Sequence, residues 1–174
     1  YLRLNTSGQV PTLVHGGTAL TQSLAIIEYL EEILPGVAPL LPPAHEATQR
    51  ARVRALAAAM VCDVQPLQNK ACAERVSAIR GTEPPVRDAQ FAAWAIARGF
   101  RAYDDALAAT MGRFSVGDAF SLADVCLAPM AYNARVKYAM DLSPFPRICS
   151  VLDEVMDVPC IKLSHPDLQP PPLP

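Results

Sequence analysis

The pattern of apolar and polar positions divides the chain into a short mixed segment and a much longer helical one. Residues 9–14 and 18–20 are typical of two extended segments, and Gly16-Gly17 between them has the composition of a hairpin turn. From residue 22 to 34, isoleucines and leucines recur at helical spacing, with glutamates on the opposite face. We expect Pro35-Gly36 to end this helix, because proline cannot continue it.

Beyond residue 44 the pattern is helical almost to the end of the chain. Residues 36–44 hold three prolines and no charge, which predicts a stiff linker. The alanine-rich sequence that follows shows no strand-like alternation. It predicts helices at 45–64, 66–80, 86–111, 121–138 and 146–157, and a short one at 159–164. We expect the proline-rich residues 166–174 to run extended over the surface, with a ligand for an SH3-type domain as the alternative.

These elements predict a small α+β piece followed by an all-α domain. The predicted organisation is the α+β piece at 1–35, the linker at 36–44, the all-helical domain at 45–165 and the tail at 166–174. One hairpin and one helix cannot close a sheet domain, because the hairpin keeps an open edge and an uncovered face. We therefore expect further sheet residues to precede Tyr1.

Composition narrows the class of protein. Of the 174 residues, 51% are hydrophobic and 18% are charged, which excludes a disordered chain. The net charge of −2 argues against a nucleic-acid partner, and no apolar run approaches the ~20 residues that cross a bilayer. Five cysteines without a CxxC or a zinc-ligand spacing predict reduced, buried thiols and no metal site. We expect a globular, cytoplasmic protein with no membrane partner.

The sequence carries binding chemistry and no visible nucleophile. Nucleotide loops, HExxH and GxSxG do not occur in it, and its three histidines stand outside any motif. Val10-Pro11 is the first candidate, because a proline in an extended segment belongs at an edge, a bulge or a cis turn. In the cis form, the Val10 backbone N–H and C=O face a groove and can pair with a peptide-like ligand. A trans edge proline without such a role is the alternative.

Gln22 and Ser23 are the second candidate, because they open the first predicted helix. Free backbone N–H groups and the positive end of the helix dipole attract a carboxylate at that position. A serine hydroxyl and a glutamine amide there complete a clamp for a carboxylate or an amino acid. Ordinary capping of the helix by Thr21 or Ser23 is the alternative.

The third candidate is Gln65-Pro66-Leu67-Gln68-Asn69, where we expect the proline to interrupt or kink one long helix. Amides at such a kink can reach into a cleft, whereas the alternative is a polar helix face.

Two charged or polar groups in the last third of the chain have different expected roles. Arg135, with Lys137 close by, can hold a substrate carboxylate through two parallel hydrogen bonds. Solvated helix charge is the alternative. Ser121 and Asp124 form a capping box, whose loss should cost about 0.5–2 kcal/mol of stability, and we assign them no catalytic role.

Seven segments form one recognisable set. They are GQVPTL, LTQSLAIIEYLEE, QPLQN, VGDAFSLADVCLAP, YNAR, DLSPFP and SHPDLQP. Together they resemble the zeta class of glutathione transferases, the maleylacetoacetate and maleylpyruvate isomerases, from Leu4 to Pro172. QSLAIIEYLEE and QPLQN are characteristic of this class, whereas the Val-Pro pair and the capping box are shared by glutathione transferases in general.

The resemblance implies part of a thioredoxin-like domain followed by an all-helical domain, in a homodimer that binds glutathione and a small acidic substrate. The glutathione-binding positions that it implies are Val10, Pro11, Gln22, Ser23, Gln65 and Asn69. The Val10 backbone, before a cis Pro11, pairs with the cysteinyl part, and Gln22 and Ser23 hold the γ-glutamyl end. Gln65 and Asn69 reach the ligand from the helical domain, and Arg135 binds a substrate carboxylate.

The resemblance also implies a reaction, the cis–trans isomerisation of maleylacetoacetate-like dicarboxylic acids in the catabolism of tyrosine and phenylalanine. The glutathione thiolate adds to the cis double bond, the new single bond rotates, and elimination gives the trans isomer and glutathione. The family's Ser-Ser-Cys motif, which activates the thiol, does not occur in the 174 residues, so we expect no catalytic residue in them. A non-catalytic binding or dimerisation module is the alternative, and a detoxifying transferase for α-haloacids or peroxides is a third possibility.

Two departures from the family pattern fall near candidate residues. The family's Leu-Asn-Pro is Leu-Asn-Thr here, with Thr6 in the proline position. Arg135 follows Asn-Ala directly, whereas the family has one residue between them, and one extra residue precedes Asp141. The second departure leaves open whether Arg135 or Lys137 faces the substrate.

Overall fold

The computed structural model describes residues 1–34, 38–82 and 88–170, and it divides the chain into two units, Tyr1–Leu40 and Leu41–Pro174. The division falls inside the predicted proline-rich linker. Parts of four predicted features lie outside the described residues: the helix stop at 35–36, the first residues of the linker, the start of the helix from 86, and the end of the tail. The finer domain boundaries remain predictions.

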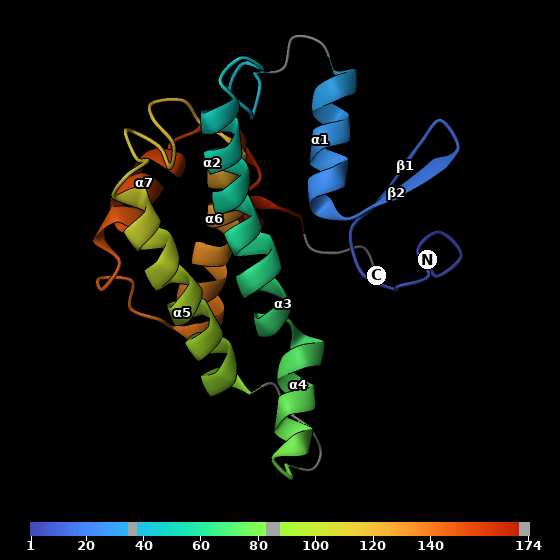
Figure 1. Ribbon diagram of the computed structural model, residues 1–174. Coiled ribbons are helices and arrows are strands. Elements are labelled where there is room, and N and C mark those ends of the chain that lie inside the picture. The colour runs from blue at the N-terminus through green and yellow to red at the C-terminus, as the bar shows by residue number, and fades with distance from the viewer. Residues whose placement is uncertain (35–37, 83–87, 171–174) are drawn as a thin grey trace. The chain divides into compact units, whose positions relative to one another are not determined.

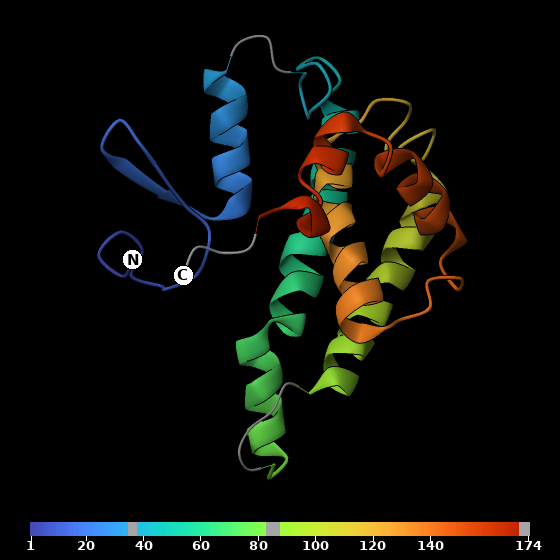
Figure 2. The ribbon, with the colours of Figure 1, turned by 180° about the vertical axis from the view of Figure 1, so that it is seen from behind.

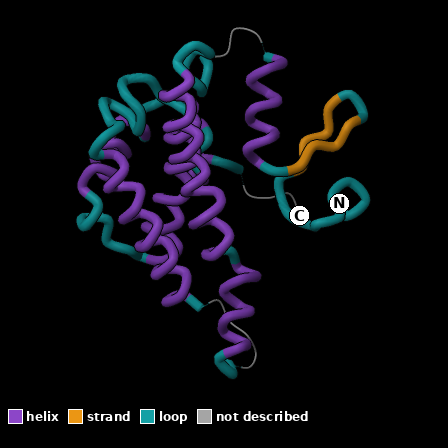
Figure 3. Tube along the Cα trace, viewed as in Figure 1, coloured by secondary structure: helices purple, strands orange, loops and turns teal. Residues whose placement is uncertain are grey.

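A two-stranded antiparallel hairpin opens the described secondary structure. Its strands are β1 (Thr12–His15) and β2 (Thr18–Thr21), drawn in orange in Figure 3. Gly16 and Gly17 form the turn with φ angles of 55° and 78°, a region that residues with a side chain rarely adopt. The hairpin predicted from the two glycines is confirmed.

One helix, α1 (Ser23–Ile33), completes the first unit. It follows β2 directly and buries Ile26. The Nδ1 atom of His15 and the hydroxyl of Tyr29 share a hydrogen bond of 2.7 Å, which ties the hairpin to the helix. The amphipathic pattern therefore predicted this helix correctly, and His15 has a packing role.

The second unit is helical, apart from an isolated bridge between Met111 and Gly117 in its described part (Figures 1 and 3). Its elements are α2 (Ala47–Ala58), the π-helix η1 (Ala59–Val64), α3 (Gln65–Gln68), α4 (Lys70–Ile79), α5 (Ala89–Leu107), α6 (Leu122–Tyr132), the π-helix η2 (Asn133–Lys137), α7 (Pro146–Val155), α8 (Pro159–Leu163) and the 3₁₀ turn η3 (Pro166–Leu168). The predicted fold class, a small α+β piece followed by an all-α domain, is confirmed.

The core of the second unit lies among its long helices. Figure 1 shows α2, α5, α6 and α7 side by side; α2 packs on α6, and α5 packs on α7 and η1. Phe100 and Leu127 are completely buried between them. A Cβ atom at Gly99 would lie 2.1 Å from the Cγ2 atom of Val64, so the glycine permits the close approach of α5 and η1.

The predicted capping box at the start of α6 is present and has an additional partner. The Asp124 carboxylate accepts hydrogen bonds from the Ser121 backbone N–H at 2.8 Å and from the Ser121 hydroxyl at 2.9 Å. It also accepts the backbone N–H of Ser115 at 2.9 Å. Because Asp124 is completely buried, it joins the preceding loop to the helix through three hydrogen bonds.

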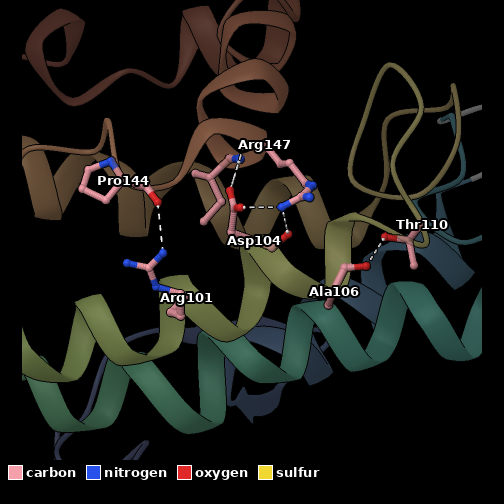
Figure 4. Close-up of polar contacts among 7 residues, drawn as sticks. Arg101, Asp104, Ala106, Thr110, Pro144 and Arg147 are labelled. Carbon is pink, nitrogen blue, oxygen red and sulfur yellow. Dashed lines mark hydrogen bonds and ion pairs between the residues drawn. The ribbon is translucent and has the colours of Figure 1, made fainter.

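A second buried carboxylate caps a helix from another element. Asp104 of α5 accepts the backbone N–H groups of Arg147 and Ile148, both at 2.9 Å, in the first turn of α7. The Nη1 atom of Arg147 also donates to it at 3.1 Å (Figure 4). Arg101, which also lies in α5, donates to the Pro144 carbonyl at 3.4 Å (Figure 4). Asp104 therefore fixes the start of α7 against α5.

The long predicted helices are interrupted in ways that the pattern did not indicate. The helix predicted at 45–64 continues from α2 into η1, and the helix predicted at 121–138 continues from α6 into η2. The helix changes type next to Pro66, because the π-helix η1 ends at Val64 and α3 begins with Gln65 and Pro66, a position where proline is tolerated. The chain leaves the helical conformation three residues later, at Asn69, with φ −62° and ψ 145°.

The start of the C-terminal tail is folded against α6 instead of extended. Figure 2 shows these last described residues, in red, lying across α6. The ring of His165 packs edge-on against Tyr132 with centroids 5.4 Å apart, and the Tyr132 hydroxyl donates to Asp167 at 3.0 Å. This hydrogen bond raises the pKa of Tyr132. The expected extended run is therefore wrong for 166–168.

The cysteines are less buried than expected. All are free thiols, but Cys62 and Cys160 are exposed, Cys72 and Cys149 are half-buried, and Cys126 is buried. Burial raises the pKa of Cys126 to about 11, so this thiol stays protonated at neutral pH. The prediction of buried thiols is wrong for the other four.

Candidate functional site

The Val10–Pro11 peptide bond is cis, as predicted. It directly precedes β1, whose first residue, Thr12, pairs with the last residue of β2, Thr21. Val10–Pro11 precedes β1 and Gln22–Ser23 follows β2, so both pairs lie at the open end of the hairpin. The structure brings these two candidate groups together within the first unit.

A buried asparagine holds the loop that leads to Val10. Asn5 is 7% exposed, and its Nδ2 atom donates to the Gln9 carbonyl at 2.6 Å. Its Oδ1 atom accepts the backbone N–H of Ser7 at 3.1 Å and the Ser7 hydroxyl at 2.7 Å. The Tyr1 hydroxyl donates to the same Gln9 carbonyl. Asn5 was not among the predicted residues, although an asparagine two residues before a serine is a signal for such a turn.

Gln22 and Ser23 lie at the N-terminus of α1 with exposed side chains. The helix begins after Gln22, whose φ is 72° and whose carbonyl accepts the Ile26 N–H at 3.0 Å. No side-chain capping hydrogen bond is formed there, so the ordinary cap considered for Thr21 or Ser23 is not what the structure shows. The first-turn N–H groups remain available to an anion, and no acidic residue lies in that turn.

Gln65 is the first residue of the short helix α3, and Asn69 directly follows its last residue. Gln65 is exposed at the point where η1 ends, and Asn69 is half-buried at the break before α4. Gln68, between them, is 6% exposed. The amides of this segment therefore differ in exposure: Gln65 is exposed, Asn69 is half-buried and Gln68 is buried.

Arg135 and Lys137 lie in η2 and both are exposed. A π turn closes hydrogen bonds from i to i+5, so it holds about one residue more than an α turn. Both cations therefore lie in one π turn, and the choice between Arg135 and Lys137 as the substrate-facing residue stays a prediction.

One hydrogen bond joins the two candidate groups of the second unit. The hydroxyl of Tyr138, which follows η2, donates to the backbone carbonyl of Gln68 at 2.9 Å. This contact places the segment with Gln65 and Asn69 beside the segment with Arg135. The sequence pattern did not single out Tyr138, because its partner is a backbone atom 70 residues away.

The described residues, 1–34, 38–82 and 88–170, hold no group of three or more histidine, cysteine or acidic side chains that fits a metal ion. In the same ranges, no helix is long and apolar enough to span a membrane. The arrangement offers backbone hydrogen-bonding groups, amides and cations for an anionic ligand. We find no acid–base pair among the predicted site residues.

Comparison with known proteins assigns the chain to a family. Models of the glutathione S-transferase N-terminal domain and C-terminal domain match residues 1–33 and 76–163. Maleylacetoacetate isomerase of Mus musculus is 40% identical over 167 residues, which cover 96% of this chain and 72% of that protein. The chain spans 65% to 76% of the length of the curated relatives compared with it.

Solved structures agree with these matches. A maleylacetoacetate isomerase from Methylobacterium extorquens AM1, solved with bound malonate and glutathione, has a TM-score of 0.89 and 36% identity over 97% of this chain and 78% of its own. A maleylpyruvate isomerase described as a bacterial zeta-class glutathione S-transferase has a TM-score of 0.87 and 37% identity, with the same coverage. The chain belongs to the glutathione S-transferase family. Within it, the chain falls in the zeta class with the maleylacetoacetate isomerases, which confirms the resemblance seen in the sequence.

Proposed function

We propose that this chain binds glutathione and serves in the glutathione-dependent cis–trans isomerisation of maleylacetoacetate-like dicarboxylic acids. The observation that carries the proposal is the 40% identity to the Mus musculus maleylacetoacetate isomerase over 96% of the chain. The similarity includes both units and is not confined to one of them. A non-catalytic module is not favoured, because relatives matched over this length are isomerases.

The first unit fits the peptide part of glutathione. Val10 is 83% exposed beside the cis bond, so its backbone is accessible to a peptide-like ligand. The N-terminus of α1 with Gln22 and Ser23 lies at the same end of the hairpin and suits the carboxylate of the γ-glutamyl end. In the second unit, Gln65 and Asn69 supply amides for the ligand. When bound, glutathione supplies the thiol that adds to the double bond.

The substrate in this proposal is a small dicarboxylate. Arg135 offers a planar guanidinium that suits a carboxylate, and Lys137 in the same turn is the backup. The M. extorquens relative was solved with malonate, a dicarboxylate, beside glutathione. This supports an acidic substrate without identifying it.

Three finer features of the proposal rest on membership of the class. We propose that the protein acts as a homodimer, in the cytoplasm, and in the catabolism of tyrosine and phenylalanine. The names of the relatives support the last of these, because maleylacetoacetate is the substrate they specify.

Glutathione titration of the purified chain by calorimetry tests the proposal. We expect saturable binding, and we expect Ser23→Ala to weaken it by about 10-fold, since one hydrogen bond to a charged group is lost. Ser150→Ala, at an exposed serine of α7, is the matched control and should leave the Kd unchanged. An absence of binding to the folded wild-type chain would overturn the proposal.

A further inference from the structure

The chain breaks its helical path at Asn69, between α3, which begins with Gln65 and ends at Gln68, and α4. In a continuous helix the Gln68 carbonyl would accept the N–H of Cys72. Here Asn69 takes an extended conformation with ψ 145°, and the next helix starts with the Asn69 carbonyl, which accepts the Ala73 N–H at 3.0 Å. The break thus removes the Gln68 carbonyl from the helical ladder.

Tyr138 provides the donor that this carbonyl accepts. Its hydroxyl lies 2.9 Å from the Gln68 oxygen, and its ring is half-buried. The Tyr138 backbone N–H donates to the Asn133 carbonyl and closes the π turn that contains Arg135. Tyr138 therefore ends the π turn that contains Arg135 and also donates a hydrogen bond to the Gln68 carbonyl at the break before α4.

We propose that Tyr138 is a positioning residue that sets the Asn69 break and fixes it beside the Arg135 turn. This inference rests on the proposed function, because it assigns the consequence to glutathione held by Gln65 and Asn69. Without the hydroxyl, the backbone carbonyl of the buried residue Gln68 loses the hydrogen bond that Tyr138 donates. The cost of that loss favours a rearranged break, which moves the Asn69 amide from the position that the ligand requires.

Tyr138→Phe tests the inference, because it removes one oxygen atom and keeps the ring. We expect it to raise the Kd for glutathione about 5- to 10-fold in the purified chain. Tyr132→Phe is the matched control: it removes a tyrosine hydroxyl from the neighbouring helix, where the partner is Asp167 at 3.0 Å. We expect its Kd to stay within twofold of the wild-type value.

A double-mutant cycle separates positioning from a general structural effect. If Tyr138 acts through Asn69, Tyr138→Phe should change the Kd by less than twofold in a chain that already carries Asn69→Ala. An equal loss in both backgrounds would show a merely structural role and overturn the inference. Unchanged binding by Tyr138→Phe, with Ser23→Ala still impaired, would overturn the inference alone. No binding by the wild-type chain would overturn the proposed function as well.

Hydrogen exchange keeps the inference testable should Tyr138→Phe fail to fold. In the wild-type chain, glutathione should slow amide exchange in residues 69–73 and in residues 134–140 together, because the Tyr138 hydroxyl links them. Slowing in the first segment without the second would contradict the inference.

Discussion

Replacing Arg135 by alanine is expected to raise the KM for the dicarboxylate substrate by about 10- to 100-fold. A guanidinium that holds a carboxylate contributes charge-assisted hydrogen bonds worth roughly 1.5–3 kcal/mol, and each 1.4 kcal/mol is tenfold in affinity. The affinity for glutathione should change little, because its proposed contacts come from other residues. The measurement is steady-state kinetics on an enzyme that contains this chain, with substrate and glutathione varied separately.

Two further variants distinguish the cations of the π turn. Arg135→Lys should recover part of the loss, since a lysine supplies charge without the planar pair of donors. An unchanged KM in Arg135→Ala together with an impaired Lys137→Ala would show that the extra residue has moved the role to Lys137. If neither variant changes the KM, the substrate carboxylate is bound outside η2.

Replacing Asp124 by alanine is expected to lower the free energy of unfolding by about 3–5 kcal/mol. The completely buried carboxylate accepts three hydrogen bonds, and its removal leaves buried donors on Ser115 and Ser121 without an acceptor. A capping box alone would cost about 0.5–2 kcal/mol, so the larger value tests the contact with Ser115 that only the structure shows. Urea unfolding with the m-value held constant measures the change.

Asp118→Ala is the matched control for this prediction. Asp118 is exposed and accepts one backbone N–H, that of Arg113 at 2.9 Å, in the loop before α6. We expect a loss of about 1 kcal/mol or less, because water replaces this partner. Similar losses from Asp118→Ala and Asp124→Ala would contradict a special role for the buried carboxylate.

Local patterns were sufficient for the features that depend on neighbouring residues. The hairpin at Gly16-Gly17, the helix from Ser23 and the capping box at Ser121 each rest on chemistry within a few positions, and the structure shows all three. The cis bond before Pro11 was also predicted, from a proline in an extended segment. The wider fold class followed from the change of hydrophobic period near residue 44.

Features that depend on distant partners were not predicted. At the break at Asn69, Tyr138 donates to the Gln68 carbonyl, and the start of α7 is held by Asp104 across 43 residues. Hydrophobic spacing does not distinguish a π turn from an α turn, so η1 and η2 were read as continuous helix. The roles of the glutathione and substrate residues are still predictions, because they depend on a ligand.

The isomerisation rate with and without glutathione tests the central claim most directly. It is measured on the 174-residue chain and on the same chain preceded by a segment with Ser-Ser-Cys, using maleylacetoacetate as substrate. We predict glutathione-dependent turnover by the longer protein, and a rate at least about 100-fold lower for the 174 residues alone, since they contain no Ser-Ser-Cys to activate the thiol. A longer protein that binds glutathione but does not isomerise the substrate, or equal rates from the two proteins, would contradict the account.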